Sequence, residues 1–270
     1  MITFDLTRCV GCGKCVWDCF PGAITLEAGR PALTAPDSCI GCGHCIAVCP
    51  AGAVSDPALP GDDVQPVRKE HDPEALLGSM RARRSCRHYT DAPVTKQELT
   101  MLLSAARACP TAKNLQATRY ISVTKQIPAI LDAALDALAH VGEMQLKTAT
   151  DPGELRRARN FIAWQQQRRE DGAFDPLFFH APQLLMFVAS GNDARDAAAA
   201  AAYTELMAAE LGLGCLYSGY FTACCAGSRE IQAMLGLAPD EQVVRCLVLG
   251  HPDVKFRRTA PRKPVSLTEL

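Results

Sequence analysis

The stretch that decides the fold is a repeated run of cysteines near the start of the chain. Residues 9–19 read CVGCGKCVWDC, and residues 39–49 read CIGCGHCIAVC. The four cysteines of the first run recur thirty positions later, so that Cys9, Cys12, Cys15 and Cys19 match Cys39, Cys42, Cys45 and Cys49. Such a repeat indicates two copies of one structural unit, each organised around its thiols.

The spacing within each run favours a metal cluster as the object that the thiols hold. Thiolates two residues apart cannot all share one face of a helix or strand, but they can wrap around a compact body with several corners, such as a cubane of iron and sulfide. Glycines at positions 11, 13, 41 and 43 let the backbone approach and direct N–H groups at sulfur. Zinc is the alternative, but zinc sites usually take two thiolate pairs far apart in sequence. So few apolar residues accompany the runs that bound metal must support folding.

This pattern resembles the two-[4Fe–4S] bacterial-type ferredoxins over residues 1–56. The resemblance implies that the fourth cysteine of each run serves the other run's cluster. It implies two ligand sets: Cys9, Cys12, Cys15 and Cys49 for one cluster, and Cys39, Cys42, Cys45 and Cys19 for the other. Pro50 matches the family's trailing proline, whereas Phe20 intervenes before Pro21 in the first run.

The composition agrees with a redox protein and excludes several other classes. The chain has 270 residues, 14 cysteines and a net charge of −1, so binding nucleic acid through bulk positive charge is not expected. No apolar run approaches the roughly 18 residues that span a bilayer. The N-terminus lacks the basic start and apolar stretch of a secretory signal, so we expect a soluble, cytoplasmic protein whose cysteines hold metal rather than form disulfides.

Beyond a linker expected at 57–72, the sequence predicts an α+β domain over 73–270 with more helices than strands. Thr95 and Glu98 form a capping box, which predicts a helix over 96–108. The other predicted helices and strands follow from apolar periodicity. Helices are expected over 73–82, 128–140, 154–169, 193–211 and 228–236, and strands over 118–124, 184–189, 215–221 and 243–249.

Two polar segments of this domain suggest a phosphate-bearing cofactor. Residues 81–89 read RARRSCRHY, and four arginines in seven residues suit phosphate because the guanidinium binds two oxygens at once. Residues 108–116 read ACPTAKNLQ after a helix. Alone, the first segment is more typical of a basic solvated surface, and the second of an ordinary loop.

Together these segments resemble the nitroreductase family, whose members are FMN enzymes. The resemblance extends to ELGLGCLYSG at 210–219 and LGHPDVKFRR at 249–258. It implies a mainly antiparallel sheet flanked by helices, in a homodimer. The order of the two domains is similar to a known group of fused chains in anaerobic bacteria and archaea.

The family implies a set of FMN-binding residues. Arg83, Ser85 and Arg87 would hold the phosphate and ribityl chain, Arg84 would contribute through its backbone, and Arg258, with Arg257 as runner-up, would complete the clamp. The segment that reaches the flavin from the second subunit would supply Pro110, Thr111, Asn114 and Gln116. The stretch along the isoalloxazine ring would be Leu216, Tyr217, Ser218 and Gly219, where Ser218 replaces a typical acidic residue.

Three features stay open at this point. Cys109 and Cys215 fall near the implied flavin and are either substrate-facing or buried. The aromatics of 140–182, Trp164, Phe174, Phe178 and Phe179, together with His180, either shape a substrate pocket or only pack a helical lid. No GxGxxG loop follows a strand, so a dedicated nicotinamide module is not expected, although NAD(P)H can stack directly on FMN.

The sequence therefore predicts an iron–sulfur flavoprotein oxidoreductase. Electrons from a one-electron donor, such as a ferredoxin, would pass through two [4Fe–4S] clusters to FMN and on to an oxidised organic acceptor such as a nitroaromatic. The alternative is an electron relay, in which NAD(P)H reduces FMN and the clusters pass single electrons to a partner protein. A third hypothesis is an enzyme that uses oxygen. It is less favoured, because exposed clusters are damaged by oxygen. In its simplest form the first of these schemes requires no acid–base side chain, since solvent or ribityl hydroxyls can supply protons.

Overall fold

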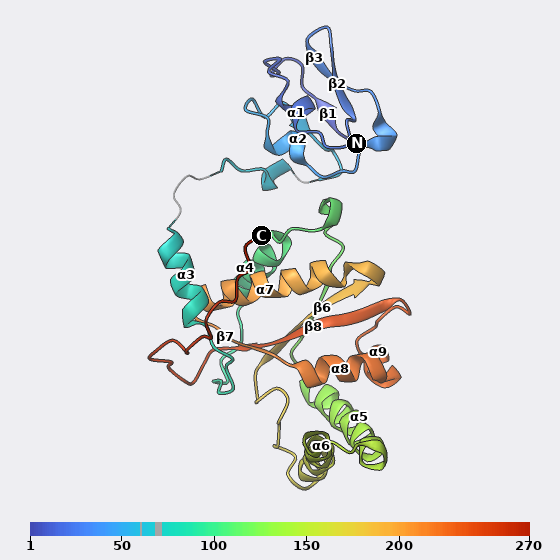
Figure 1. Ribbon diagram of the computed structural model, residues 1–270, viewed down its shortest axis with the longest axis vertical. Coiled ribbons are helices and arrows are strands. Elements are labelled where there is room, and N and C mark those ends of the chain that lie inside the picture. Colours follow the sequence, from blue (N-terminus) through green and yellow to red (C-terminus); the bar gives the residue numbers. More distant parts are fainter. Residues whose placement is uncertain (60, 68–71) are drawn as a thin grey trace. The chain divides into compact units, whose positions relative to one another are not determined.

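The computed structural model describes residues 1–59, 61–67 and 72–270. The chain divides into two compact units, one of Met1–His71 with Pro110–Gln116 and one of Asp72–Cys109 with Ala117–Leu270. Each unit has a buried cluster of its own. Of the linker expected at 57–72, residues 60 and 68–71 lie outside the described residues. Figure 1 shows the elements of both units.

The first unit repeats its secondary structure as its sequence repeats. Helices α1 (Lys14–Trp17) and α2 (His44–Ala47) each follow a glycine, Gly13 or Gly43, whose φ of 69° or 78° is left-handed. Strand β2 (Ile24–Glu27) pairs antiparallel with β3 (Arg30–Leu33). Strand β1 (Thr3–Phe4) pairs antiparallel with β4 (Val54–Ser55). The pairing of β1 with β4 ties the start of the unit to its end.

This unit has a small apolar core. Its cluster of buried residues consists of three aliphatic side chains, Ile2, Ile24 and Val54, and the two cysteines Cys15 and Cys45. A core of this size gives little stability by itself, so the unit depends on what its thiols bind.

The second unit is built on a four-stranded antiparallel sheet in the order β5–β6–β8–β7. The strands are β5 (Arg119–Val123), β6 (Gln183–Ser190), β7 (Gly214–Tyr217) and β8 (Glu241–Gly250). Its helices are α3 (Pro73–Ala82), α4 (Lys96–Arg107), α5 (Ile127–Thr148), α6 (Pro152–Glu170), α7 (Ala194–Glu210), α8 (Gly219–Gly227) and α9 (Arg229–Met234).

Alternate residues of each central strand enter opposite cores. On β6, Leu184 and Met186 pack with α5 and α8, whereas Leu185 and Phe187 pack with α4 and the alanine face of α7. Both faces of the sheet are therefore covered by helices, as Figure 1 shows. The predicted fold class, α+β with an antiparallel sheet flanked by helices, is confirmed.

The capping residues in the sequence correctly predicted where two helices begin. The Asp72 carboxylate accepts hydrogen bonds from the backbone N–H groups of Glu74 and Ala75, both at 3.0 Å, and α3 begins at Pro73. The Thr95–Glu98 capping box is present in both directions at the start of α4.

Two expected boundaries are wrong. The stretch 215–221 was expected to be extended, but β7 ends at Tyr217 and α8 begins at Gly219. Helix α8 reads GYFTACCAG; it buries Phe221, Cys224 and Cys225 on one face, but its exposed face carries glycine, alanine and tyrosine rather than charged residues, so the sequence shows no amphipathic contrast. The helix expected over 128–140 continues to Thr148, because Gly142 does not end it. A Cβ at Gly142 would lie 2.6 Å from the carbonyl oxygen of Ala158, so this glycine permits close packing of α5 on α6.

No helix in the described residues is long and apolar enough to cross a membrane.

Candidate functional site

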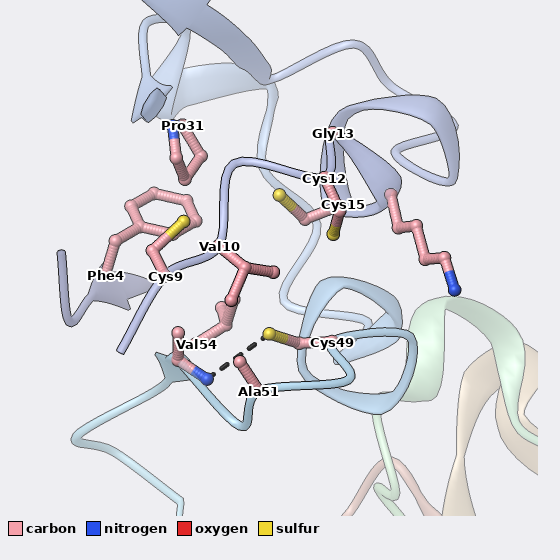
Figure 2. A pocket seen from close by; sticks show the side chains of 12 residues that line it. Phe4, Cys9, Val10, Cys12, Gly13, Cys15, Pro31, Cys49, Ala51 and Val54 are labelled. Carbon is pink, nitrogen blue, oxygen red and sulfur yellow. Dashed lines mark hydrogen bonds between the residues drawn. The ribbon is translucent and has the colours of Figure 1, made fainter. Parts of the chain in front are cut away.

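Four thiols from the two cysteine runs line one pocket in the first unit. Cys9, Cys12 and Cys15 come from the first run, and Cys49 comes from the second. Figure 2 shows these side chains around the same space, with Phe4, Pro31 and Val54 on its apolar side. This grouping matches the first ligand set that the ferredoxin resemblance implies.

A second pocket repeats the arrangement with the runs exchanged. Cys39, Cys42 and Cys45 of the second run line it together with Cys19 of the first. The turn after each short helix returns its cysteine to the other run's loop, since α1 and α2 pack against each other. Neither pocket includes a histidine or carboxylate apart from His44 in the second.

The donor set fits iron–sulfur clusters better than single ions. All fourteen cysteines are free thiols. Each pocket is lined by four thiols, and within the described ranges no group of three or more His, Cys, Asp or Glu side chains is already placed to hold a single metal ion. Backbone N–H groups already point at two of the sulfurs: Gly11 N–H donates to Cys9 Sγ at 3.4 Å, and Ala53 N–H to Cys49 Sγ at 3.2 Å (Figure 2 shows the second). Such bonds stabilise thiolate ligands and tune cluster potentials.

Burial raises the pKa of two of these thiols, which disfavours the thiolate form that binds metal. Desolvation raises the pKa of Cys45 to about 11, and it raises the pKa of Cys15 as well. Both groups are therefore neutral until metal binds, and binding must release their protons.

In the second unit, the arginine-rich segment lies against the edge strand β7. Ser85 and Cys215 form a parallel bridge, and Cys86 N–H donates to the Cys215 carbonyl at 2.9 Å. The structure thus places Ser85 and Cys86 beside Cys215, directly before the stretch 216–219.

Glu205 on α7 joins these two segments, and the sequence did not point to it. Arg83 Nη1 donates to Glu205 Oε1 at 2.7 Å, and the Tyr217 hydroxyl also hydrogen-bonds this carboxylate. The side chain of Glu205 is 12% exposed and that of Arg83 is 28% exposed. Burial raises the pKa of Glu205 against the opposing effects of Arg83 and Tyr217. Burial and the charge of Glu205 also raise the pKa of Tyr217.

The remaining predicted residues of this unit lie around the same edge. Arg84 is half-buried, and the exposed Arg87 has its guanidinium carbon 5.9 Å from the centre of the Phe179 ring. Ser218 is buried and donates to the Leu177 carbonyl at 3.3 Å, while Gly219 begins α8.

The C-terminal segment returns to the arginine-rich segment. Asp253 N–H donates to the His88 carbonyl and Thr90 N–H to the His251 carbonyl, both at 2.9 Å. Arg257 and Arg258 follow in an exposed stretch without regular secondary structure.

The segment Pro110–Gln116 groups with the first unit, whereas Arg83 belongs to the second. It is a tight turn in which Asn114 N–H donates to the Thr111 carbonyl and Gln116 N–H to Thr111 Oγ1. Asn114 and Gln116 have positive φ angles of 55° and 50°, which cost free energy in residues with a side chain.

Comparison with known proteins identifies the larger unit. The nitroreductase family model matches residues 80–251, which is more than half of the chain. The chain belongs to the nitroreductase family. A second family model, described as a 4Fe-4S dicluster domain, matches residues 8–53. No curated protein matches the chain.

Solved structures agree on the fold. A nitroreductase with bound FMN from Bacteroides fragilis has 18% identity and a TM-score of 0.55, over 72% of this chain and 98% of that one. One with bound FMN from Desulfitobacterium hafniense has 21% identity and a TM-score of 0.51, over the same shares. A BluB-like flavoprotein from Clostridium difficile has 15% identity and a TM-score of 0.56, over 72% and 99%.

The structure shows whether two sets of residues in this nitroreductase-family domain are buried: the cysteines Cys109 and Cys215, and the aromatic residues of 140–182. Cys215 and Cys109 are both buried at 5% exposure, and burial raises the pKa of each, so they are neutral thiols. Phe178 is fully buried against Phe221 and is a core residue rather than a pocket wall. Trp164 packs in an aromatic cluster with Phe161 and Tyr220.

Proposed function

We propose that the chain is an iron–sulfur flavoprotein oxidoreductase that carries electrons from a one-electron donor, through two [4Fe–4S] clusters and FMN, to an oxidised organic acceptor such as a nitroaromatic. The observation that carries this proposal is the grouping of eight free thiols into two sets of four, in the same chain as a nitroreductase-family domain. When bound, the clusters exchange single electrons and FMN exchanges one or two.

In this proposal residues 1–56 of the first unit hold the clusters. Cys9, Cys12, Cys15 and Cys49 bind one, and Cys39, Cys42, Cys45 and Cys19 bind the other. The N–H groups of Gly11 and Ala53 stabilise the negative charge on two ligating sulfurs. Because the unit's own core is small, cluster binding and folding of this unit are coupled.

Residues 73–270, after a linker over 57–72, form the FMN domain. The guanidinium groups of Arg83, Arg87 and Arg258 and the hydroxyl of Ser85 hold the phosphate and ribityl chain, with Arg84 contributing its backbone N–H. Glu205 fixes the Arg83 guanidinium by the 2.7 Å ion pair. The backbone of Leu216–Gly219 lies along the ring system, where Tyr217 is fixed by its bond to Glu205.

The protein would work as a cytoplasmic homodimer. Pro110, Thr111, Asn114 and Gln116 would reach the flavin of the second subunit, and the strained turn around Asn114 is consistent with a binding role. No side chain is assigned as an acid–base catalyst, since solvent or ribityl hydroxyls can supply protons.

Anaerobic stopped-flow mixing tests the direction of flow. The iron-replete, FMN-loaded protein is mixed with reduced ferredoxin, NADH or NADPH, and cluster and flavin absorbance are followed separately. Cluster bleaching before flavin bleaching, with ferredoxin alone effective, is the expected result. Flavin bleaching first with a nicotinamide would instead support the electron relay.

A variant tests the wiring. Cys45→Ser should abolish ferredoxin-driven turnover and leave FMN bound, whereas the matched Cys225→Ser, in the core of the second unit, should leave both intact. Full ferredoxin-driven turnover in the Cys45 variant would refute the proposed electron path.

A further inference from the structure

A cavity of about 510 Å³ lies within the second unit, between α5, α6 and α8. Its volume falls in the range of roughly 300–1,000 Å³ that is typical of small-molecule sites. None of the residues predicted to hold FMN or a cluster lines it. The cavity therefore needs an explanation separate from the cofactors.

Small residues on α8 create the hollow. Ala223 and Gly227 face it, and a Cβ built on Gly227 would meet no atom within 4 Å. On the opposite side, α5 and α6 are locked together by the close approach at Gly142, so they cannot move in to fill the space. Leu138 and Phe161 give the cavity apolar walls.

Among the described residues, the charged side chains that line the cavity are two arginines. His140, Arg157 and Arg229 line it, and no described Asp or Glu does. Arg157 has one acidic neighbour, Glu154, but the two charges are 3.9 Å apart and both side chains are about half exposed. Such a pair is weak, so Arg157 can still bind another anion.

We propose that this cavity binds a small organic anion with an aromatic or other apolar body. Its acidic group would pair with Arg157 and Arg229, and its body would lie on Leu138 and Phe161. This site is independent of the electron path proposed above, because it requires neither the clusters nor FMN.

Isothermal titration of the FMN- and cluster-loaded protein tests the proposal with matched probes. The anionic probe is 6-hydroxy-2-naphthoate, and 2-naphthol has the same ring and hydroxyl without the carboxylate. We expect one saturable site that prefers the naphthoate. Loss of both cationic partners in Arg157→Gln/Arg229→Gln should weaken naphthoate binding by about tenfold or more and leave 2-naphthol unchanged.

Two further variants separate the cavity from general surface charge. Arg156→Gln/Arg159→Gln removes two arginines of α6 that do not line the cavity, and it should bind the naphthoate like the wild type. Ala223→Trp fills the cavity from an exposed position and should abolish binding of both probes.

Absence of naphthoate binding to the wild type, or binding that persists in Ala223→Trp, would overturn the proposal. The proposal would also be overturned if the wild type bound neither probe and the Ala223→Trp variant had a lower mass than the wild type in light scattering. A second copy of the chain would then occupy the cavity.

Discussion

The exchange of cysteines between the two runs makes a prediction that pairs of variants can test. Cys49 and Cys12 line the same pocket although they belong to different runs, whereas Cys49 and Cys42 belong to one run and line different pockets. Removing two ligands of one cluster destroys one cluster, and removing one ligand of each destroys both. Cys49→Ala/Cys12→Ala should therefore retain about four of about eight iron atoms per chain, and Cys49→Ala/Cys42→Ala should retain almost none.

The assay is iron and acid-labile sulfide per chain after anaerobic purification and reconstitution. The single variants Cys49→Ala, Cys12→Ala and Cys42→Ala should each keep about four iron atoms, and Cys225→Ala in the second unit should keep about eight. If each run held its own cluster, the two double variants would exchange their iron contents. That exchange would refute the pocket assignment.

Three further predictions concern the second unit, each read from urea unfolding followed by circular dichroism. Glu205→Ala should cost about 1–3 kcal/mol because it leaves Arg83 and Tyr217 without their shared acceptor, whereas Glu205→Gln should cost under about 1 kcal/mol. Because the pKa of Glu205 is raised on folding, wild-type stability should fall relative to Glu205→Gln as the pH rises above 4.5, and the opposite trend would contradict the burial effect. Arg119 holds the pKa of Glu241 at about 2 through hydrogen bonds of 2.7 and 2.6 Å, so Glu241→Gln should cost about 0.5–1 kcal/mol at neutral pH, discounted for the exposure of the pair. That cost should be present above pH 4.5 and disappear as the pH falls through 2, and a cost independent of pH would count against the ion pair. Gly142→Ala should destabilise by about 1–3 kcal/mol because its Cβ would meet the Ala158 carbonyl, while the matched Gly78→Ala in α3, with no atom within 4 Å, should stabilise slightly; equal effects would refute the packing argument.

Features that the sequence predicted correctly are those set by neighbouring residues. The capping box of α4 and the aspartate cap of α3 depend on residues at most three positions apart. The strand alternation of β5 and the apolar runs of β6 and β8 likewise carry their own signal. The antiparallel sheet and its helical layers followed from these elements together with the family resemblance.

What the sequence did not predict depends on distant partners. Helix α8 lacks an amphipathic period in its sequence because its exposed face is made of glycine, alanine and tyrosine, and only its packing against α5 shows which face is buried. The segment Pro110–Gln116 groups with the first unit, which no local pattern could indicate. The cavity between α5, α6 and α8 arises where small residues leave a space that no side chain from another element fills, and a local sequence pattern does not show this.

Glu205 shows why a cluster of like charges in a sequence is a poor guide to a site's net charge. Arg83 and Glu205 are 122 positions apart, and the only local hint was an acid beside the buried alanine face of α7, next to Ala201 and Ala208. A half-buried guanidinium without a counter-charge is destabilised by desolvation even when no phosphate is bound. Glu205 supplies this counter-charge, with its Oε1 atom 2.7 Å from Arg83 Nη1. The four arginines of 81–87 therefore do not contribute four free positive charges. In the proposed site, Arg83 would therefore meet the phosphate with its charge partly neutralised by Glu205, and Arg87 and Arg258 would supply most of the uncompensated positive charge.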